Sequence, residues 1–188
     1  MEEWNSLKKR IWTIPNVLSL LRLAMVPLFV WLYCGAEDPV MTAAVLVLSG
    51  LTDVADGLIA RRYGMVSDLG KILDPLADKL TQAAMLVCLI TRFPGMLMIF
   101  LLLALKESFA GVCGVLVIRR TGQVLGAEWH GKLAALLLYG MIVAHVVWYD
   151  IPAPVSDGMI AACAVMMLVT CVLYGVRNLR LLRSFEGA

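Results

Sequence analysis

Charged residues are scarce in this sequence. They make up 16% of its 188 residues, whereas about 25% is usual in soluble domains. Apolar residues make up 61%, and the mean hydropathy is +0.86. A chain of this composition cannot cover a fold with polar groups in water, which excludes an ordinary soluble domain. We therefore predict an integral membrane protein.

Other common features are also missing. The five cysteines show no C-x-x-C spacing, so we expect neither a zinc site nor a disulfide framework. The chain has no internal repeat, low-complexity tract or long linker. Its length suits one domain, so we predict a single membrane domain over residues 1–188. We expect the lipid bilayer as its surroundings and no nucleic-acid partner.

Long apolar stretches dominate what is present. A helix needs about 20 apolar residues to cross the hydrocarbon. Six stretches satisfy this condition, at residues 16–34, 40–61, 71–92, 95–118, 132–149 and 158–176. The sequence predicts an all-α protein with six transmembrane helices in one bundle over residues 16–176. A short amphipathic surface helix is expected before them, at residues 1–13.

The charges predict an orientation. Six spans would place both termini on one side, together with nearly all the lysines and arginines. The opposite side would hold Arg92 and the acids Glu37, Asp38, Asp150 and Asp157. Because loops rich in Lys and Arg stay in the cytoplasm, we predict cytoplasmic termini and a multi-pass protein of the cell (inner) membrane.

Four aspartates fall within two of the predicted spans. A charge at the bilayer centre costs about 2.5–3.5 kcal/mol on insertion scales, so such residues usually face a polar cavity. Asp53 and Asp56 are three residues apart, and Asp74 and Asp78 are four apart, so each pair shares a helix face. The connecting loop is short, which predicts antiparallel neighbours whose four carboxylates converge at the cytoplasmic side. Divalent cations that prefer oxygen ligands would resolve their repulsion.

Glycines and an arginine accompany these carboxylates. Gly57 and Gly70 would let a ligand approach the backbone closely, and the Arg61 guanidinium suits a phosphate. Metal, glycine and arginine together indicate a nucleotide diphosphate. Two alternatives remain: buried ion pairs between the acids and Arg61, Arg62, Lys71 and Lys79, and a cation channel or transporter. Against a channel, the acids cluster at one depth and do not line a route across the bilayer.

The residues follow the pattern Asp53-x2-Asp56-Gly57-x2-Ala60-Arg61-x8-Gly70-x3-Asp74-x3-Asp78. This pattern resembles, at all its fixed positions, the signature of the CDP-alcohol phosphotransferase family. The resemblance implies two Mg²⁺ or Mn²⁺ ions bound by the four aspartates, a homodimer, and an active site open to the cytoplasm. It further implies that Asp78 is the general base toward the acceptor hydroxyl. The CDP moiety would be held by Asp53, Asp56, Gly57, Ala60, Arg61, Gly70 and Asp74.

A second segment resembles one branch of that family. Asn16, Ser19 and Arg22 match the Asn-x2-Thr-x2-Arg segment of phosphatidylglycerophosphate synthases, with serine in place of threonine. The implied reaction transfers the phosphatidyl group of CDP-diacylglycerol to glycerol 3-phosphate and releases CMP. CMP-forming cardiolipin synthases share much of the pattern, so that reaction and other headgroups stay open.

A phosphorylated acceptor needs cations beyond those that serve CDP. Arg119, Lys132 and Arg177 lie at predicted cytoplasmic helix ends and are candidates to bind the acceptor phosphate. The alternative is that they only contact anionic lipid headgroups. Lys106 and Glu107 lie deep in the fourth predicted span, where a structural ion pair or a contact with the aspartates is expected.

Overall fold

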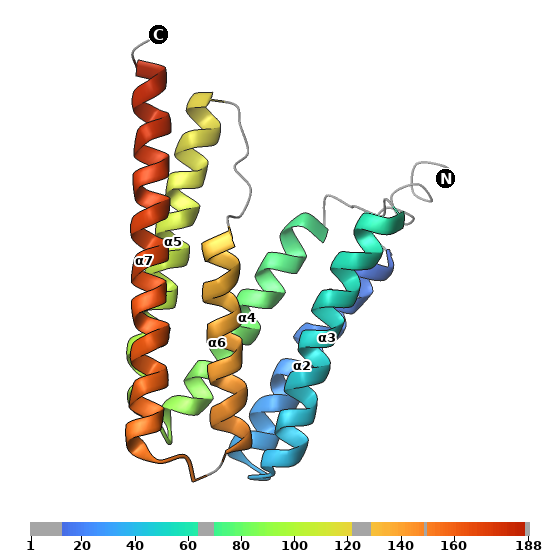
Figure 1. Cartoon of the computed structure of the whole chain (residues 1–188). Coiled ribbons are helices and arrows are strands. Elements are labelled where there is room, and N and C mark those ends of the chain that lie inside the picture. Colours follow the sequence, from blue (N-terminus) through green and yellow to red (C-terminus); the bar gives the residue numbers. More distant parts are fainter. Residues whose placement is uncertain (1–12, 64–69, 122–128, 149, 187–188) are drawn as a thin grey trace, which may run out of the picture. The chain divides into compact units, whose positions relative to one another are not determined.

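A computed structural model describes residues 13–63, 70–121, 129–148 and 150–186. Over these residues it contains six helices and no strand. The predicted surface helix at residues 1–13 lies outside the described residues except for Thr13. The helices, coloured along the chain in Figure 1, are α2 (Ile14–Cys34), α3 (Pro39–Tyr63), α4 (Gly70–Ile90), α5 (Met96–Thr121), α6 (Trp129–Val147) and α7 (Ala153–Glu186).

The chain divides into two compact units. The first comprises residues 1–89 and 146–149, and the second comprises residues 90–145 and 150–188. The first unit therefore holds α2, α3 and nearly all of α4. The second holds α5, most of α6 and α7.

Local sequence signals start the first two helices of the first unit. The Thr13 hydroxyl accepts a hydrogen bond from the Asn16 amide at 3.5 Å and caps α2. At α3, Oδ1 of Asp38 accepts from the amides of Val40 and Met41, both at 3.0 Å. Such caps satisfy amides that have no partner within the helix.

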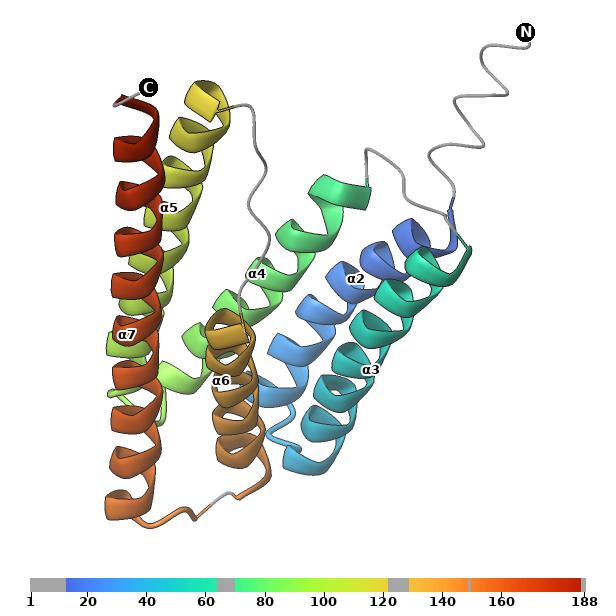
Figure 2. The ribbon, with the colours of Figure 1, turned by 45° about the horizontal axis from the view of Figure 1, so that its top comes forward.

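Apolar packing joins the helices of the first unit. α2 packs along α3, and its side chains Met25 and Phe29 are 8% and 2% exposed. Leu46 of α3 and Leu86 of α4 are both fully buried. α3 and α4 run in opposite directions, and α2 lies beside α3 (Figures 1 and 2). The arrangement brings the carboxyl-terminal half of α3 and the amino-terminal half of α4 to the same end of this unit.

In the second unit, α5 and α7 pack side by side and run in the same direction. A Cβ added at Gly95 would lie 3.1 Å from Ile160, and one added at Gly175 would lie 3.4 Å from Phe109. The second contact lies further along the chain than the first on both helices, so α5 and α7 are parallel. α6 meets α7 closely at Gly131, where an added Cβ would lie 2.3 Å from the Tyr174 hydroxyl.

A buried histidine connects two helices of the second unit. Nδ1 of His145 is 2.8 Å from the Met141 carbonyl oxygen, and Nε2 is 2.9 Å from the Ser156 hydroxyl. A carbonyl can only accept, so Nδ1 carries the proton and Nε2 accepts from Ser156. The Phe93 ring packs edge-on against the imidazole. These contacts give His145 a structural role.

Five helices are long and apolar enough to cross a membrane, and many of their side chains point outward. The segments are Asn16–Cys34, Pro39–Ile59, Met96–Val115, Trp129–Val147 and Ala153–Asn178. Val40, Leu136 and Val172 are 74%, 69% and 64% exposed, as expected of residues that face lipid. α4 carries four charged residues (Lys71, Asp74, Asp78 and Lys79) in its 21, and is not among the five. The all-α membrane class is therefore supported, whereas the sixth span stays a prediction.

Candidate functional site

The signature residues lie on α3 and α4, at the end of the first unit where α3 ends and α4 begins. Asp53 and Gly57 lie on the last three turns of α3. Gly70 is the first residue of α4 and is buried. Asp56, Ala60 and Arg61 also belong to α3, but their side chains lie outside the described part of the structure.

Asp53 forms an ion pair with α2. Nη1 of Arg22 lies 2.5 Å from Oδ1 of Asp53. The Arg22 side chain is fully buried, whereas the Asp53 side chain is 48% exposed. A buried guanidinium next to a half-exposed carboxylate compensates its charge from inside the protein. The outer part of the carboxylate can still meet a ligand.

Asp74 and Asp78 have different partners. The Ser19 hydroxyl of α2 donates a hydrogen bond to Oδ1 of Asp74. Asp78 accepts from Nε2 of Gln82 at 2.9 Å on Oδ1, and Nζ of Lys79 lies 3.4 Å from Oδ2. Asp74 is thus connected to another helix, and the described contacts of Asp78 come from its own helix.

The described carboxylates are close enough to influence one another. Asp53 experiences the charges of both Asp78 and Asp74, which lie on the antiparallel α4. Among the described side chains, no three His, Cys, Asp or Glu residues lie close enough together to hold one ion. The donor set, made only of carboxylate oxygens, nevertheless fits a hard divalent cation. Two of these carboxylates are drawn toward α2 by Arg22 and Ser19.

The contribution of α2 to this site was not predicted from the sequence. Asn16, Ser19 and Arg22 recur every third residue and are 2%, 0% and 0% exposed. Their spacing in an otherwise apolar helix is a signal that one face of α2 meets polar groups. The resemblance to a family segment had singled them out, but nothing local indicates that Ser19 contacts a residue 55 positions away.

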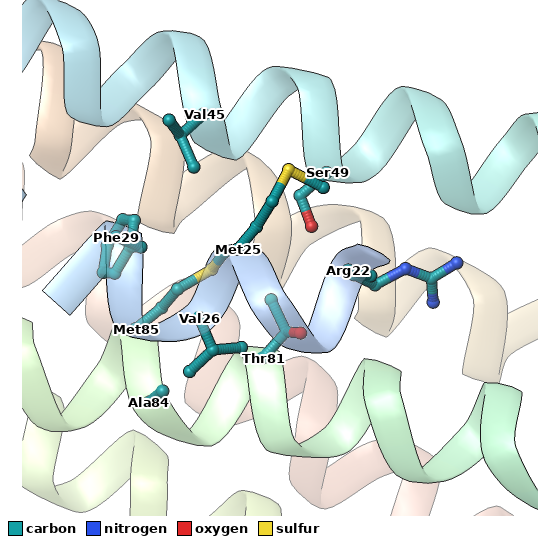
Figure 3. A pocket seen from close by; sticks show the side chains of 9 residues that line it. All are labelled: Arg22, Met25, Val26, Phe29, Val45, Ser49, Thr81, Ala84 and Met85. Atoms are coloured by element: carbon teal, nitrogen blue, oxygen red, sulfur yellow. The ribbon is translucent and has the colours of Figure 1, made fainter. Parts of the chain in front are cut away.

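A small cavity lies beside Arg22. Its volume is about 10 Å³, which is at the lower limit for one water molecule. Figure 3 shows α2 between α3 and α4, with the Arg22 guanidinium pointing away from the apolar side chains of Met25 and Phe29. The buried Ser49 hydroxyl also lines the cavity. The charged end of Arg22 is therefore directed along α2, away from the apolar core.

Only one of the ion pairs expected under the purely structural alternative is seen among the described residues. Lys79 lies near Asp78, but the partner of Asp53 is Arg22, which that alternative did not include. Arg62 is exposed, and the side chains of Arg61 and Lys71 are outside the described residues. The described pairs leave Asp53 half exposed, which a purely structural pair does not need.

The acceptor-phosphate candidates lie in the second unit. Lys132 follows Gly131, which touches the Tyr174 hydroxyl, and the Arg177 guanidinium lies 5.0 Å from the centre of the same ring. The residue before Lys132 and the guanidinium of Arg177 therefore both lie near the Tyr174 side chain. Arg119 lies ten residues beyond Phe109, whereas Arg177 lies only two beyond Gly175. Along parallel helices this offset amounts to about 12 Å, so Arg119 is displaced from the other two.

Lys106 and Glu107 form the ion pair that was one of the two expectations for them. Nζ of Lys106 lies 2.8 Å from Oε1 of Glu107, and the side chains are 11% and 32% exposed. Both residues belong to α5 in the second unit. Their mutual contact accounts for two charges within an apolar helix.

Comparison with known proteins identifies the family. A model of the CDP-alcohol phosphatidyltransferase family matches residues 12–175. The match includes the α2 segment, the signature on α3 and α4, and the helices of the second unit up to Gly175. It therefore covers most of the chain.

Individual relatives carry two kinds of name. A probable phosphatidylglycerophosphate synthase of Mycobacterium tuberculosis is 33% identical over 92% of this chain and 85% of its own length. A CDP-diacylglycerol–glycerol-3-phosphate 3-phosphatidyltransferase of Bacillus subtilis is 30% identical over 78% of this chain and 85% of its own length. A CMP-forming cardiolipin synthase of Streptomyces coelicolor is 42% identical, but the match covers 60% of this chain and 54% of that protein. The chain belongs to the CDP-alcohol phosphatidyltransferase family.

Proposed function

We propose that this protein transfers the phosphatidyl group of CDP-diacylglycerol to glycerol 3-phosphate, giving phosphatidylglycerophosphate and CMP in phospholipid biosynthesis. One observation carries the proposal. Asp53, Asp74 and Asp78 occupy the signature positions on two antiparallel helices of one unit, and Arg22 and Ser19 of α2 contact Asp53 and Asp74. Family membership supports the assignment of this carboxylate group to a nucleotide-lipid substrate.

Binding of the CDP moiety is assigned to the signature residues. Asp53, Asp56 and Asp74 would act with Gly57, Ala60, Arg61 and Gly70. Gly70 begins α4, and the amino-terminal end of a helix favours an anion. The half-exposed Asp53 lies on the facing helix. The diphosphate would therefore lie between the end of α3 and the start of α4.

The proposed chemical step uses Asp78 as the general base. Its carboxylate takes the proton of the acceptor hydroxyl, and the hydroxyl oxygen bonds to the phosphorus that carries diacylglycerol. The bond between this phosphorus and the departing CMP oxygen breaks. Gln82 donates to Oδ1 of Asp78 at 2.9 Å and so fixes the orientation of the base.

Two Mg²⁺ or Mn²⁺ ions are part of the proposal. Asp53, Asp56, Asp74 and Asp78 would hold them. A bound divalent cation neutralises charge on the diphosphate and on the departing CMP. The chain itself supplies the oxygen ligands, and Arg22 and Ser19 hold one oxygen each of Asp53 and Asp74.

The names of the relatives indicate two acceptors. The Mycobacterium and Bacillus relatives, each matched over 85% of its length, favour glycerol 3-phosphate. The Streptomyces relative is more similar over a shorter stretch and favours phosphatidylglycerol as acceptor, with cardiolipin as product. Lys132, which follows the Gly131 next to Tyr174, and Arg177, whose guanidinium lies over the Tyr174 ring, are proposed to bind the acceptor phosphate, with Arg119 further along the same unit.

A direct test separates the two acceptors. The purified protein would receive CDP-diacylglycerol and Mn²⁺ with either labelled glycerol 3-phosphate or phosphatidylglycerol, and lipid products would be identified by mass spectrometry. We expect phosphatidylglycerophosphate in the first reaction. Cardiolipin in the second reaction alone would instead establish the cardiolipin synthase assignment.

The setting of the enzyme is proposed as well. We place it in the cell (inner) membrane, with the site open to the cytoplasm and two chains in a homodimer. The five apolar helices and the distribution of positive charge support this placement. Ion flux through reconstituted protein without CMP release would favour the channel or transporter alternative.

A further inference from the structure

One face of α2 changes from apolar to polar along its length. Met25, Phe29 and Leu32 are buried at its carboxyl-terminal half, whereas Ser19 and Arg22 are buried at its amino-terminal half. A fully buried guanidinium and a fully buried hydroxyl are costly unless they meet partners. The polar part of this face therefore needs a reason beyond helix packing.

Both polar side chains meet carboxylates of the candidate site. The Ser19 hydroxyl donates to Oδ1 of Asp74 on α4, and Arg22 pairs with Oδ1 of Asp53 on α3 at 2.5 Å. Successive turns of a single helix thus contact one signature carboxylate on each of two other helices. Figure 3 shows α2 between these helices, with the Arg22 guanidinium pointing away from Ser49 and Thr81.

The contacts involve only part of each carboxylate. Ser19 and Arg22 each contact Oδ1 of their carboxylate. A carboxylate held by one oxygen has a fixed plane and presents the other oxygen in a defined direction. Groups that orient metal-binding carboxylates in this way typically change metal affinity or activity 10- to 100-fold when removed.

We propose that Ser19 and Arg22 are positioning residues, which set the orientation of Asp74 and Asp53 from α2 and so pre-arrange the metal-binding oxygens. The proposal rests on the proposed function, because it assigns these carboxylates to a divalent cation. Arg22 adds a fixed positive charge that reduces repulsion among Asp53, Asp74 and Asp78 before a cation arrives. Neither residue is assigned a contact with the reacting atoms.

Ser19 provides the cleaner experiment, since its replacement changes no charge. Mn²⁺ binding to the purified full-length chain would be measured by electron paramagnetic resonance, with the metal alone as probe. We expect Ser19→Ala to weaken Mn²⁺ affinity by about 10- to 100-fold, and Ser19→Thr, which keeps the hydroxyl, to restore it. The Mn²⁺ concentration for half-maximal CMP release should rise by the same factor.

A matched control is Thr42→Ala. Thr42 lies on α3 eleven residues before Asp53 and is also fully buried, but its hydroxyl donates to the carbonyl oxygen of Asp38, the residue before α3. Its Mn²⁺ affinity should equal that of the unchanged chain. Thermal unfolding midpoints of all variants would separate lost orientation from lost folding. A lower midpoint for Ser19→Ala with unchanged Mn²⁺ affinity would overturn the proposal by showing a purely structural role.

Arg22 is tested by Arg22→Lys and Arg22→Met. The lysine retains the charge without the planar donor group, so we expect it to keep more Mn²⁺ affinity than the methionine. Equal affinity of both variants and the unchanged chain would contradict a positioning role. If the unchanged chain binds Mn²⁺ and Ser19→Ala does not, but no CMP is released, the proposed reaction fails while this inference stands.

Discussion

The three described aspartates of the site are held in different ways. Asp53 and Asp74 are connected to α2 by Arg22 and Ser19, whereas the described partners of Asp78 are Gln82 and Lys79 on α4 itself. The first arrangement fixes two carboxylates that are proposed to bind a cation relative to another helix. Asp78 is proposed both to bind a cation and to act as the base, and its described contacts come from its own helix.

Replacing Asp78 tests its role as the base. Asp78→Asn keeps the shape of the side chain but removes its ability to take a proton at neutral pH. We expect CMP release to fall by about 10²- to 10⁴-fold, while binding of CDP-diacylglycerol stays measurable. The control is Asp150→Asn, whose carboxylate is 90% exposed and lies near Arg92 in the other unit. Near-normal turnover of Asp78→Asn would rule out the base assignment.

Asp56 is assigned to the cation and to CDP, so its replacement should affect both. Asp56→Asn removes a charged oxygen ligand, and we expect Mn²⁺ affinity and CDP affinity to fall together. Calorimetric titration with Mn²⁺ and then with CDP would measure the two. Unchanged Mn²⁺ affinity in this variant would contradict the ligand assignment.

At the scale of helices, hydropathy predicted the apolar middle part of each helix but not the residues at which the helix begins and ends. The predicted span 158–176 is part of α7, which runs from Ala153 to Glu186. Its last ten residues include Arg177, Arg180 and Arg183. These arginines end the apolar stretch, and with it the predicted span, but arginine has a high helix propensity, so the helix continues. Its start lies before Gly158, because Pro154 fits the first turn of a helix.

The sequence predicted which aspartates belong to the candidate site but not which side chains they contact. The spacing of Asp53, Asp74 and Asp78 follows from helical periodicity, and their placement on antiparallel helices follows from a short loop. The contacts of Ser19 and Arg22 depend on how α2 packs between two later helices. No local pattern in the sequence encodes that packing.

The contact between Gly131 of α6 and Tyr174 of α7 gives a prediction about stability. An added Cβ at Gly131 would lie 2.3 Å from the Tyr174 hydroxyl oxygen and 3.3 Å from Cζ. We expect Gly131→Ala to destabilise the protein by about 1–3 kcal/mol through overpacking, and Tyr174→Phe to restore much of the loss by removing the clashing oxygen. Thermal unfolding midpoints in detergent would measure both.

Gly140 of the same helix is the control for this pair. Nothing lies within 4 Å of a Cβ added there, so Gly140→Ala should leave stability unchanged or raise it slightly. An equal loss of stability in Gly131→Ala and Gly140→Ala would show that helix propensity, and not the contact with Tyr174, controls the result.

At the scale of the whole molecule, the open question of topology depends on α4. Five helices qualify as spans by length and composition. If α4 also crosses, the two termini lie on one side; if it does not, they lie on opposite sides. Its charged residues lie within its first ten, and we predict that the remaining apolar part and the polar site allow it to cross.

Cysteine labelling tests this topology. In a chain whose five native cysteines are replaced, Asn5→Cys and Ala188→Cys should react with an impermeant maleimide only after the membrane is opened. Glu37→Cys, in the turn between α2 and α3, should react in intact cells. Labelling of only one of the two terminal variants in intact cells would show that α4 does not span.

The most direct test of the central claim is acceptor-dependent CMP release by the purified protein. CDP-diacylglycerol and Mg²⁺ or Mn²⁺ would be supplied with glycerol 3-phosphate, phosphatidylglycerol, inositol phosphate or serine, and with EDTA as the blank. The account predicts CMP release with glycerol 3-phosphate that EDTA abolishes. CMP release that is unaffected by EDTA, or no release with any acceptor from protein that binds CDP-diacylglycerol, would contradict it.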